Sequence, residues 1–181
     1  TITARVESSA TLSSVEVVHR LDTVAGNGTW LRTSMYDDGI NGGDEHAGDG
    51  LYTAVITQYT AQANIVQFYV EALADGGATT QLPKLGPNRP ALWIVDARTM
   101  PNTLMQERFI LSQYDREAMI ATSGDSAPYG YHFPRMSNHF FNATFISNES
   151  EVFYNAEIRK SGSPFTRSSN NDLTHGKWKL P

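Results

Sequence analysis

The chain has 181 residues, 40% of them hydrophobic and 18% charged, which suffices for one folded domain or for a domain and part of another. Its net charge of -5 and the lack of a Lys and Arg cluster argue against a nucleic-acid partner. The sequence contains no cysteine, so disulfides, cysteine zinc sites and thiol nucleophiles are excluded. No apolar run approaches the roughly 18 residues that cross a membrane, so we expect no membrane span in this chain.

Short β-rich runs separated by turn residues fill the first part of the chain. In the second of these runs Val15, Val17 and His19 share one face, as a strand that covers a core on one side requires. Residues 1–82 are therefore predicted to form an immunoglobulin-like or fibronectin-like antiparallel β-sandwich, with a generic antiparallel barrel as the alternative. The predicted strands are ITARV, SVEVVHRLD, TWLRTSMYD, GLYTAVITQY, NIVQFYVEALAD and ATTQLP.

Residues 83–91 are predicted to be a linker, because three prolines and a glycine resist both helix and central strand. Residues 92–181 are predicted to form a small, incomplete α+β segment. It begins with the apolar strand ALWIVDA and continues with a helix over residues 100–122, for which Asn102 or Thr103 is the expected N-cap. The remaining elements are a hairpin of HFFNATFIS and EVFYNAEIRKSG, joined through Asn148, Glu149 and Ser150, and a final strand-like run, KWKLP.

The stretch YDDGINGGDEHAGDGLYTAVI, residues 36–56, concentrates five acidic residues among glycines. Three interpretations compete: a calcium loop, an acidic catalytic site, or a hairpin connection that only needs turn residues. Calcium takes about six to eight oxygens from closely spaced carboxylates, amides and carbonyls. The spacing is not that of an EF-hand, and Asp-Gly and Gly-Gly pairs also suit a plain turn. The expected calcium ligands are Asp37, Asp38, Asn41, Asp44 and Asp49.

Other patterns carry residue types that are associated with chemistry. SGDSAP, residues 123–128, resembles part of a serine-protease signature but lacks its following glycines and a marked base. His132 and His139 have no third zinc ligand near them, so ordinary loop histidines are expected. Sequons, which accept glycans only in a eukaryotic secretory route, begin at Asn27, Asn142 and Asn148. Aromatic residues expected in the core and rim of the sandwich, rather than as a sugar platform, are Trp30, Tyr36, Tyr59, Phe68 and Tyr69.

The acidic stretch resembles a recurring Ig-like module of large bacterial surface and secreted proteins, often seen ahead of CotH-type (spore-coat-kinase-like) domains. The shared pattern is M-x-DDG-x-x-GD-x-x-AGDG-x-Y-T-A followed by V-x-FYVEA-x-AD-x-G, with a one-residue insertion around Asn41 and Gly42. The resemblance implies that the acidic stretch is the signature connection of the module, with aspartates that bond to the loop backbone and can hold a metal. The matching residues are Met35, 37–39, Gly43, Asp44, 47–50, 52–54 and 68–72.

The second half resembles the beginning of a CotH-type domain, on the cues NATFISNESEVFYNAEIRKSGSPFTR and GKWKLP. In that family a hairpin with the pattern Y-x-x-x-x-R-x-x-G-S begins a kinase-like N-lobe. The residues that match it are Tyr154, Arg159, Gly162 and Ser163. A lysine-bearing strand follows, and the resemblance implies that Lys177 or Lys179 pairs with the phosphates of ATP bound with Mg²⁺. The acidic residues that would hold magnesium are absent up to Pro181, so we do not expect this chain alone to be an enzyme.

These observations predict a non-enzymatic structural, adhesion or assembly segment of a larger bacterial extracellular or cell-surface protein. The sequence starts within ITARV and ends within KWKLP, as a processed or excised segment would. Its partners are expected to be other copies or other surface proteins, through exposed edge strands. The alternative is the N-terminal portion of a CotH-like ATP-dependent kinase whose C-lobe lies beyond Pro181. A weaker alternative is a carbohydrate-binding sandwich with a polysaccharide partner.

Overall fold

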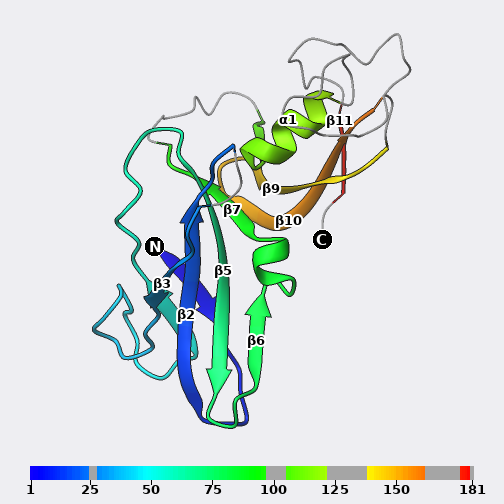
Figure 1. Cartoon of the computed structure of the whole chain (residues 1–181). Helices are drawn as coiled ribbons and strands as arrows, with labels where there is room; N and C mark the ends of the chain where they lie inside the picture. The colour runs from blue at the N-terminus through cyan, green and yellow to red at the C-terminus, as the bar shows by residue number, and fades with distance from the viewer. Residues whose placement is uncertain (25–27, 97–104, 122–137, 162–175, 180–181) are drawn as a thin grey trace. The chain divides into compact units, whose positions relative to one another are not determined.

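The computed structural model describes residues 1–24, 28–96, 105–121, 138–161 and 176–179 (Figure 1). It divides into two compact units. The first comprises Thr1–Leu21 and Gly28–Ala97, and the second comprises Asp22–Asn27 and Arg98–Pro181. The described residues are mainly β, and their strand pairs are antiparallel, which confirms the predicted fold class.

The first unit contains a larger sheet with the order β3-β2-β5-β6 and a smaller sheet formed by β1 and β4. Strand β5 is long enough to pair with β7 along its first half and with β6 along its second half. Each of the six predicted runs coincides with one strand of this unit, and only β2 begins earlier than predicted, at Leu12 instead of Ser14. The elements are β1 (Ile2–Arg5), β2 (Leu12–Leu21), β3 (Leu31–Ser34), β4 (Leu51–Ala54), β5 (Ile65–Ala74), β6 (Thr79–Leu82), the 3-10 helix η1 (Gly86–Asn88) and β7 (Ala91–Ile94).

The core of the first unit lies between the two sheets. Val15 and Val17 of β2 pack there with Phe68 and Val70 of β5, so the predicted alternation along β2 is confirmed. Residues of the smaller sheet cover this layer, because the side chains of Ile2, Ala4 and Tyr52 pack against it. Each fully buried valine or phenylalanine contributes about 1.5–3 kcal/mol relative to an exposed one, which makes this layer the main source of stability in the unit.

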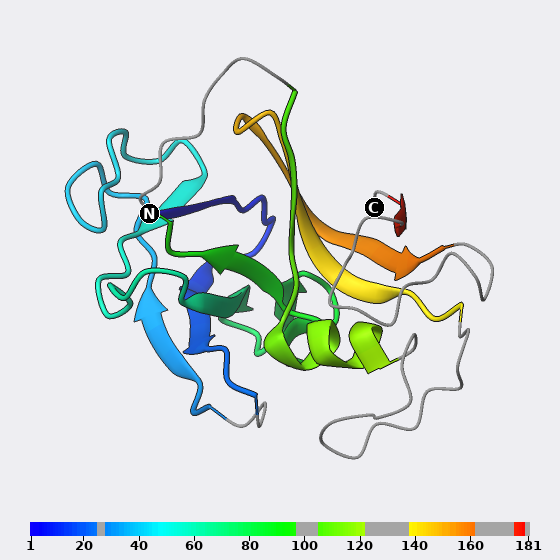
Figure 2. The ribbon, with the colours of Figure 1, turned by 90° about the horizontal axis from the view of Figure 1, so that it is seen from above.

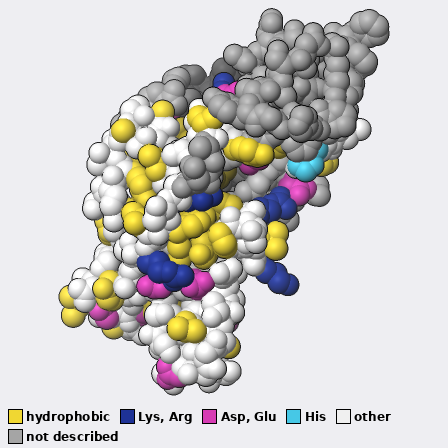
Figure 3. Space-filling view, in the orientation of Figure 1, with side chains coloured by type: hydrophobic (Ala, Val, Ile, Leu, Met, Phe, Trp, Pro, Cys, Tyr) yellow, Lys and Arg dark blue, Asp and Glu magenta, His cyan; other side chains and the backbone are white. Residues whose placement is uncertain are grey.

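The opposite face of the larger sheet carries charged residues. Glu16 of β2 and Glu71 of β5 lie directly opposite one another, and Arg32 of β3 bridges them. The Arg32 Nη1 atom lies 2.6 Å from Glu16 Oε2 and 2.8 Å from Glu71 Oε1, and the side-chain amide of Gln81 donates to Glu71 Oε2 at 2.7 Å. Figure 3 shows basic and acidic side chains side by side on this part of the surface. The network therefore links four of the five strands of the sheet, β3, β2, β5 and β6.

The segment predicted as a linker differs from the structure. Residues 83–91 include η1 and the first residue of β7, and β7 pairs with β5 in the register Phe68↔Ala91 to Ile65↔Ile94. Ala91 and Leu92 are buried, because the apolar run completes the edge of the larger sheet beside β5. The first unit therefore continues to Ala97 instead of ending at residue 82.

The second unit contains a four-stranded sheet with the order β11-β10-β9-β8 and the helix α1 beside it (Figure 2). Its core joins Ala118 and Met119 of the helix to Phe141 and Ala143 of β9 and to Ile158 of β10. No helix in the described ranges is both long and apolar enough to cross a bilayer. The elements are β8 (Glu107–Ile110), α1 (Gln113–Ala121), β9 (Phe141–Ser147), β10 (Glu151–Lys160) and β11 (Gly176–Lys179).

The helix predicted over residues 100–122 is shorter than expected, because part of that stretch is a strand. In β8, Phe109 lies opposite Phe145 of β9 and stacks on it with ring centroids 4.8 Å apart. The helix begins only after Ser112, whose hydroxyl accepts the N–H of Asp115 at 2.9 Å and donates to its carboxylate at 2.8 Å. This reciprocal N-terminal cap fixes the start of α1. The caps predicted from sequence, Asn102 and Thr103, lie outside the described residues.

The hairpin predicted through residues 148–150 is confirmed. Strands β9 and β10 pair from Ser147↔Glu151 onward, and Asn148 and Glu149 adopt positive φ angles of 53° and 54°. Asparagine tolerates this left-handed conformation better than most residues do, which suits it to the turn. A register shift between Phe153 and Ala156 adds a bulge to β10.

Candidate functional site: the acidic loop

The acidic loop, defined here as residues 36–50, connects β3 to β4. Its first residue is held at the edge of the smaller sheet, because the backbones of Tyr36 and Thr53 exchange hydrogen bonds of 2.9 and 2.8 Å. Gly42 has φ of 62°, and a Cβ atom there would collide with the carbonyl oxygen of Thr53. The glycine at this position is therefore required both by the backbone conformation and by the close approach of the loop to β4.

Asp37 fastens the two ends of the loop together. Its Oδ1 atom accepts the N–H groups of Gly48 and Asp49 at 2.8 and 3.1 Å, and its Oδ2 atom accepts the N–H of Gly50 at 3.1 Å. Hydrogen bonds to an ionised carboxylate are stronger than those between neutral groups. One side chain thus fixes three successive peptide groups just before β4 begins.

Asp38 and Asn41 form a separate small turn. The Asp38 Oδ1 atom accepts the N–H groups of Ile40 and Asn41 at 2.9 and 2.7 Å, and Oδ2 accepts the Asn41 side-chain amide at 2.7 Å. These bonds hold the pKa of the Asp38 carboxyl below its ordinary value, and the bond from the Asn41 backbone N–H has the largest effect. Although the sequence predicts both residues as calcium ligands, the structure turns them toward each other.

Three of the five predicted ligands come together. Asp37, Asp44 and Asp49 each offer a carboxylate oxygen, and these oxygens lie within 4.8 Å of one another. Asp44 is only 8% exposed, and its Oδ2 atom accepts the N–H of Gly39 at 2.5 Å. An all-oxygen, triply negative donor set suits a hard cation such as Ca²⁺, with further oxygens from carbonyls or water. These three carboxylates therefore fit a calcium ion and supply part of the oxygen ligands that it takes.

A recess of about 370 Å³ lies beside these carboxylates on the side of the smaller sheet. The hydroxyl groups of Thr3 and Thr53, on its floor, lie 3.5 Å apart. The recess gives a cation access to the loop from solvent. It is lined by Thr1, Thr3, Gly43, Asp44, Glu45, His46, Asp49, Leu51 and Thr53.

The lysines predicted to bind a nucleotide lie in β11. The register sets Lys177 opposite Arg159 and Lys179 opposite Glu157 of β10. Arg159 itself donates a hydrogen bond to the side chain of Asn138. The side chains of β11 lie outside the described part of the chain, as do Gly162 and Ser163 of the matched pattern.

The weaker candidates are distributed as follows. His139 packs edge-on against Phe141, with ring centroids 4.9 Å apart. Asn142 lies in β9, and Asn148 begins the hairpin turn. The predicted sites that fall outside the described residues are the SGDSAP stretch, His132 and Asn27.

The aromatic residues form two clusters in the first unit. Trp30 packs edge-on against Tyr69 at 5.3 Å, and the Arg20 guanidinium lies 4.3 Å from the centre of the Trp30 ring. Tyr59 and Phe68 both pack against Trp93. Their partners are aromatic and cationic groups of the same unit, as expected for core and rim positions.

A buried polar centre surrounds His19, and no specific pattern in the sequence predicts it. This side chain is 0% exposed, and its Nδ1 and Nε2 atoms lie 2.8 Å from the Tyr59 hydroxyl and 2.9 Å from the Thr33 hydroxyl. Burial lowers the pKa of the imidazole. The one available hint was that His19 follows Val15 and Val17 on the face of β2 that points into the core.

The comparisons with known proteins do not assign the chain to a family. It matches no protein-family model and no curated protein.

Proposed function

We propose that this chain is a non-enzymatic structural and assembly segment of a larger bacterial extracellular or cell-surface protein. The observation that carries the proposal is the use of the acidic residues. Asp37, Asp38 and Asp44 accept backbone N–H groups of their own loop, and Asp49 accepts the N–H of Leu51 at the start of β4. Carboxylates engaged in this way stabilise a loop conformation, and a sandwich with a rigid loop serves as a spacer or adhesion module.

The same loop is proposed to bind calcium through Asp37, Asp44 and Asp49. Three carboxylates this close repel one another, and a divalent cation between them offsets that repulsion. The ion would connect the beginning, middle and end of the loop, since these residues are spread along it. Calcium here is a structural ion that stiffens the connection between β3 and β4.

The test is the thermal unfolding of the 181-residue chain in millimolar Ca²⁺ and in excess chelator. A ligand that binds only the folded state at 100 times its Kd stabilises it by about 2.7 kcal/mol, so we expect a clearly higher melting temperature with calcium. The variant Asp44→Asn should lose this difference. The matched variant Asp38→Asn should keep it, because Asp38 lies outside the group of converging carboxylates. Equal melting temperatures of the unmodified chain under both conditions would reject the calcium role.

A second candidate function is the N-terminal portion of a CotH-like ATP-dependent kinase. It is favoured by one observation: the lysine-bearing strand β11 pairs directly with the β9–β10 hairpin, in the order that the resemblance implies. The intact mass of the native protein, measured under denaturing conditions, tests it. A mass near the 20.0 kDa of this chain would contradict the kinase interpretation. A much larger mass would support it, if the sequence beyond Pro181 contains the paired aspartates that hold magnesium.

A further inference from the structure

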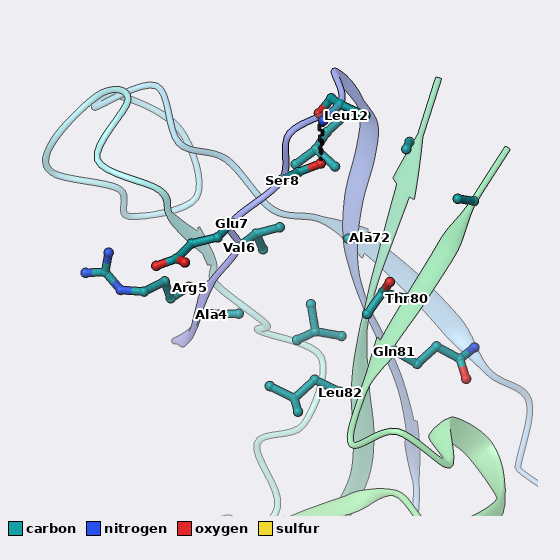
Figure 4. A pocket seen from close by; sticks show the side chains of 14 residues that line it. Ala4, Arg5, Val6, Glu7, Ser8, Leu12, Ala72, Thr80, Gln81 and Leu82 are labelled. Carbon is teal, nitrogen blue, oxygen red and sulfur yellow. Dashed lines mark hydrogen bonds between the residues drawn. The ribbon is translucent and has the colours of Figure 1, made fainter. Parts of the chain in front are cut away.

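An apolar groove lies open along one side of the first unit. It has a volume of about 390 Å³ and separates Ala4 and Val6 of the smaller sheet from Ala72 and Leu82 of the larger one (Figure 4). Leu82 pairs with Val70, so the two side chains are on the same, core-facing side of the sheet. Yet Leu82 is 65% exposed. Strand β6 therefore has a core-facing side that the smaller sheet does not cover.

The edge of β1 that borders this groove has backbone groups without a strand partner in the described part of the chain, because β1 pairs with β4 alone. The Val6 N–H donates to the Gly50 carbonyl at 2.9 Å, so the backbone groups of Val6 and of the even-numbered residues before it face β4. In an antiparallel ladder the intervening residues face the other way. The N–H and C=O groups of Thr3 and Arg5 therefore point to the open edge.

A single additional strand fits this space. Neighbouring strands lie about 4.8 Å apart and packed sheets about 10 Å apart, so a strand beside β1 would lie over β6 without entering the larger sheet. Its inward-facing side chains would meet those of Leu82 and Thr80, which are exposed and line the groove. Residues 1–8 contain no proline, and β1 pairs with β4 in a continuous register. Neither of these common barriers to pairing at a sheet edge is therefore present at β1.

Two charged side chains lie on the solvent side of the same segment. Ala4 and Val6 point toward the larger sheet, whereas Arg5 and Glu7 point away from it (Figure 4). Arg5 and Glu7 are exposed and make no ion pair or side-chain hydrogen bond with any described residue. A strand that pairs with this segment sets one of its own residues directly opposite each charge. Charge complementarity therefore favours a partner with an acidic residue opposite Arg5 and a basic residue opposite Glu7.

We infer that the groove binds an extended peptide segment of a partner protein, which adds a third strand to the smaller sheet, antiparallel to β1. Read from its N-terminus, the segment has a basic residue opposite Glu7 and an apolar residue opposite Val6. An acidic residue opposite Arg5 and a second apolar residue opposite Ala4 follow. The two apolar side chains enter the groove, and the backbone groups of the acidic residue exchange hydrogen bonds with those of Arg5. In this mode of recognition the main chain provides affinity and alternate side chains provide specificity.

The walls of the groove restrict the occupant to a segment that is not part of a sandwich. Strands β5 and β6 form the far wall, since Ala72 and Leu82 line the groove. A strand that is already covered by its own second sheet would bring that sheet into collision with β5 and β6. An extended tail or loop has no such covering layer. The antiparallel direction continues the pairing of β1 with β4 and is the more stable one per residue.

This inference rests on the proposed assembly function and states the chemistry of its partner. The probe is a capped peptide with the sequence lysine, valine, glutamate, leucine, threonine and a fluorophore at its C-terminal end. Fluorescence anisotropy with the 181-residue chain at low ionic strength should show saturable binding. Methylation of the glutamate nitrogen should weaken binding about tenfold, because it removes a main-chain hydrogen bond to β1 and adds bulk between the strands. Methylation of the leucine nitrogen is the control, because that N–H points away from β1.

Reversal of a charge tests the register. Arg5→Glu should weaken binding of the peptide about fivefold, because two glutamates then lie opposite each other. A peptide with lysine in place of its glutamate should recover the affinity for this variant and bind the unmodified chain poorly. The same reversal at Arg116, an exposed arginine of the other unit, should leave the affinity for the original peptide unchanged. Loss without recovery would contradict the proposed register.

A substitution in the groove tests where the peptide binds. Leu82→Asp should weaken binding at least tenfold, because it places a carboxylate against the apolar side chains of the peptide. Leu85→Asp is the matched control, since Leu85 is 55% exposed and is not among the residues that line the groove. Circular dichroism of each variant separates loss of binding from loss of folding. Equal affinities of the two variants would place the peptide elsewhere and overturn the inference.

Amide hydrogen exchange of the free and peptide-bound chain identifies the occupant. The amides of Thr3 and Arg5 should exchange fast in the free chain and slowly with peptide, whereas that of Val6 should be slow in both. Slow exchange at Thr3 and Arg5 in a free monomer would mean that another segment of the same chain fills the groove. Slow exchange only in a self-associated chain, detected by sedimentation equilibrium, would assign the groove to a second copy. Either result would overturn the inference.

The groove and the acidic loop are tested separately. A chain that does not bind the peptide but retains its calcium-dependent melting shift would reject the peptide site and leave the structural function intact. A chain that binds the peptide without that shift would reject the calcium role alone. Absence of saturable binding to the unmodified chain, or equal binding of the two methylated peptides, would overturn the inference whatever the effect of calcium.

Discussion

At the scale of single residues, His19 is a titratable side chain that is fully buried in the core. Its imidazole is enclosed between the hydroxyl groups of Tyr59 and Thr33, and burial lowers its pKa. In the unfolded chain the imidazole has its ordinary pKa of about 6.5. Below that pH the unfolded state binds a proton that the folded state resists. The contribution of His19 to stability is therefore complete above pH 6.5 and is lost as the pH falls below it.

We accordingly predict that the free energy of unfolding falls as the pH is lowered from 6.5, by up to about 1.4 kcal/mol per pH unit for this one group. Urea unfolding at a series of pH values measures the slope. His19→Gln, which keeps hydrogen-bonding capacity but does not titrate, should flatten it. His46→Gln in the exposed part of the acidic loop serves as the control and should retain the slope. If the slope persists in His19→Gln, another group is responsible.

At the scale of elements, the charged network on the larger sheet compensates for an unfavourable strand register. The pairing of β2 with β5 sets Glu16 directly opposite Glu71, and Arg32 lies within hydrogen-bonding distance of both. The hydrogen bonds that Arg32 donates to Glu71 and then to Glu16 raise the pKa of Arg32. Hydrogen bonding from Gln81 and from Arg32 lowers the pKa of Glu71 despite its partial burial. The arginine of β3 therefore stabilises the contact between two other strands.

Arg32→Ala should leave two carboxylates facing each other and lower the free energy of unfolding by about 0.5–1 kcal/mol, since the network is partly exposed. The loss should shrink in about 1 M salt, where the Debye length is about 3 Å. Chemical denaturation at low and high salt measures both effects. Arg32→Lys should recover part of the loss. A decrease that is the same at both salt concentrations would show that packing of the Arg32 stem, not charge, is the cause.

At the scale of the whole molecule, each unit has its own hydrophobic core. Truncation of a core side chain leaves a cavity and costs about 2–5 kcal/mol for methionine to alanine. Met119→Ala should therefore speed amide hydrogen exchange mainly in β8, β9 and β10. Val17→Ala should do so mainly in β2 and β5. Equal acceleration in both units after either substitution would mean that they unfold as one cooperative block.

The strands were predictable from sequence because alternation and turn residues are local signals. The pattern of Val15 and Val17 identified the core face of β2, and the turn at Asn148 identified the hairpin. The predicted domain boundary after residue 82 was wrong, because ALWI becomes a strand of the first unit only by pairing with β5, a contact that the local sequence does not indicate. The prediction of a long helix was wrong, because the residues around Phe109 form a strand that pairs with β9, where Phe109 stacks on Phe145, which is distant in sequence. At the candidate site, composition predicted the carboxylates, but only the folded loop separates Asp38 from Asp37 and Asp44.

The fastening of the loop by Asp37 also has a use in protein engineering. The Asp37 carboxylate binds the N–H groups of Gly48, Asp49 and Gly50, just before β4. The position of β4 is therefore independent of the number of residues between Asp37 and Gly48. A foreign peptide inserted after the exposed Glu45 would lengthen this part of the loop at an entropic cost of only about 0.6 kcal/mol per doubling of loop length. This loop is therefore a natural position for displaying an epitope on the surface of the sandwich.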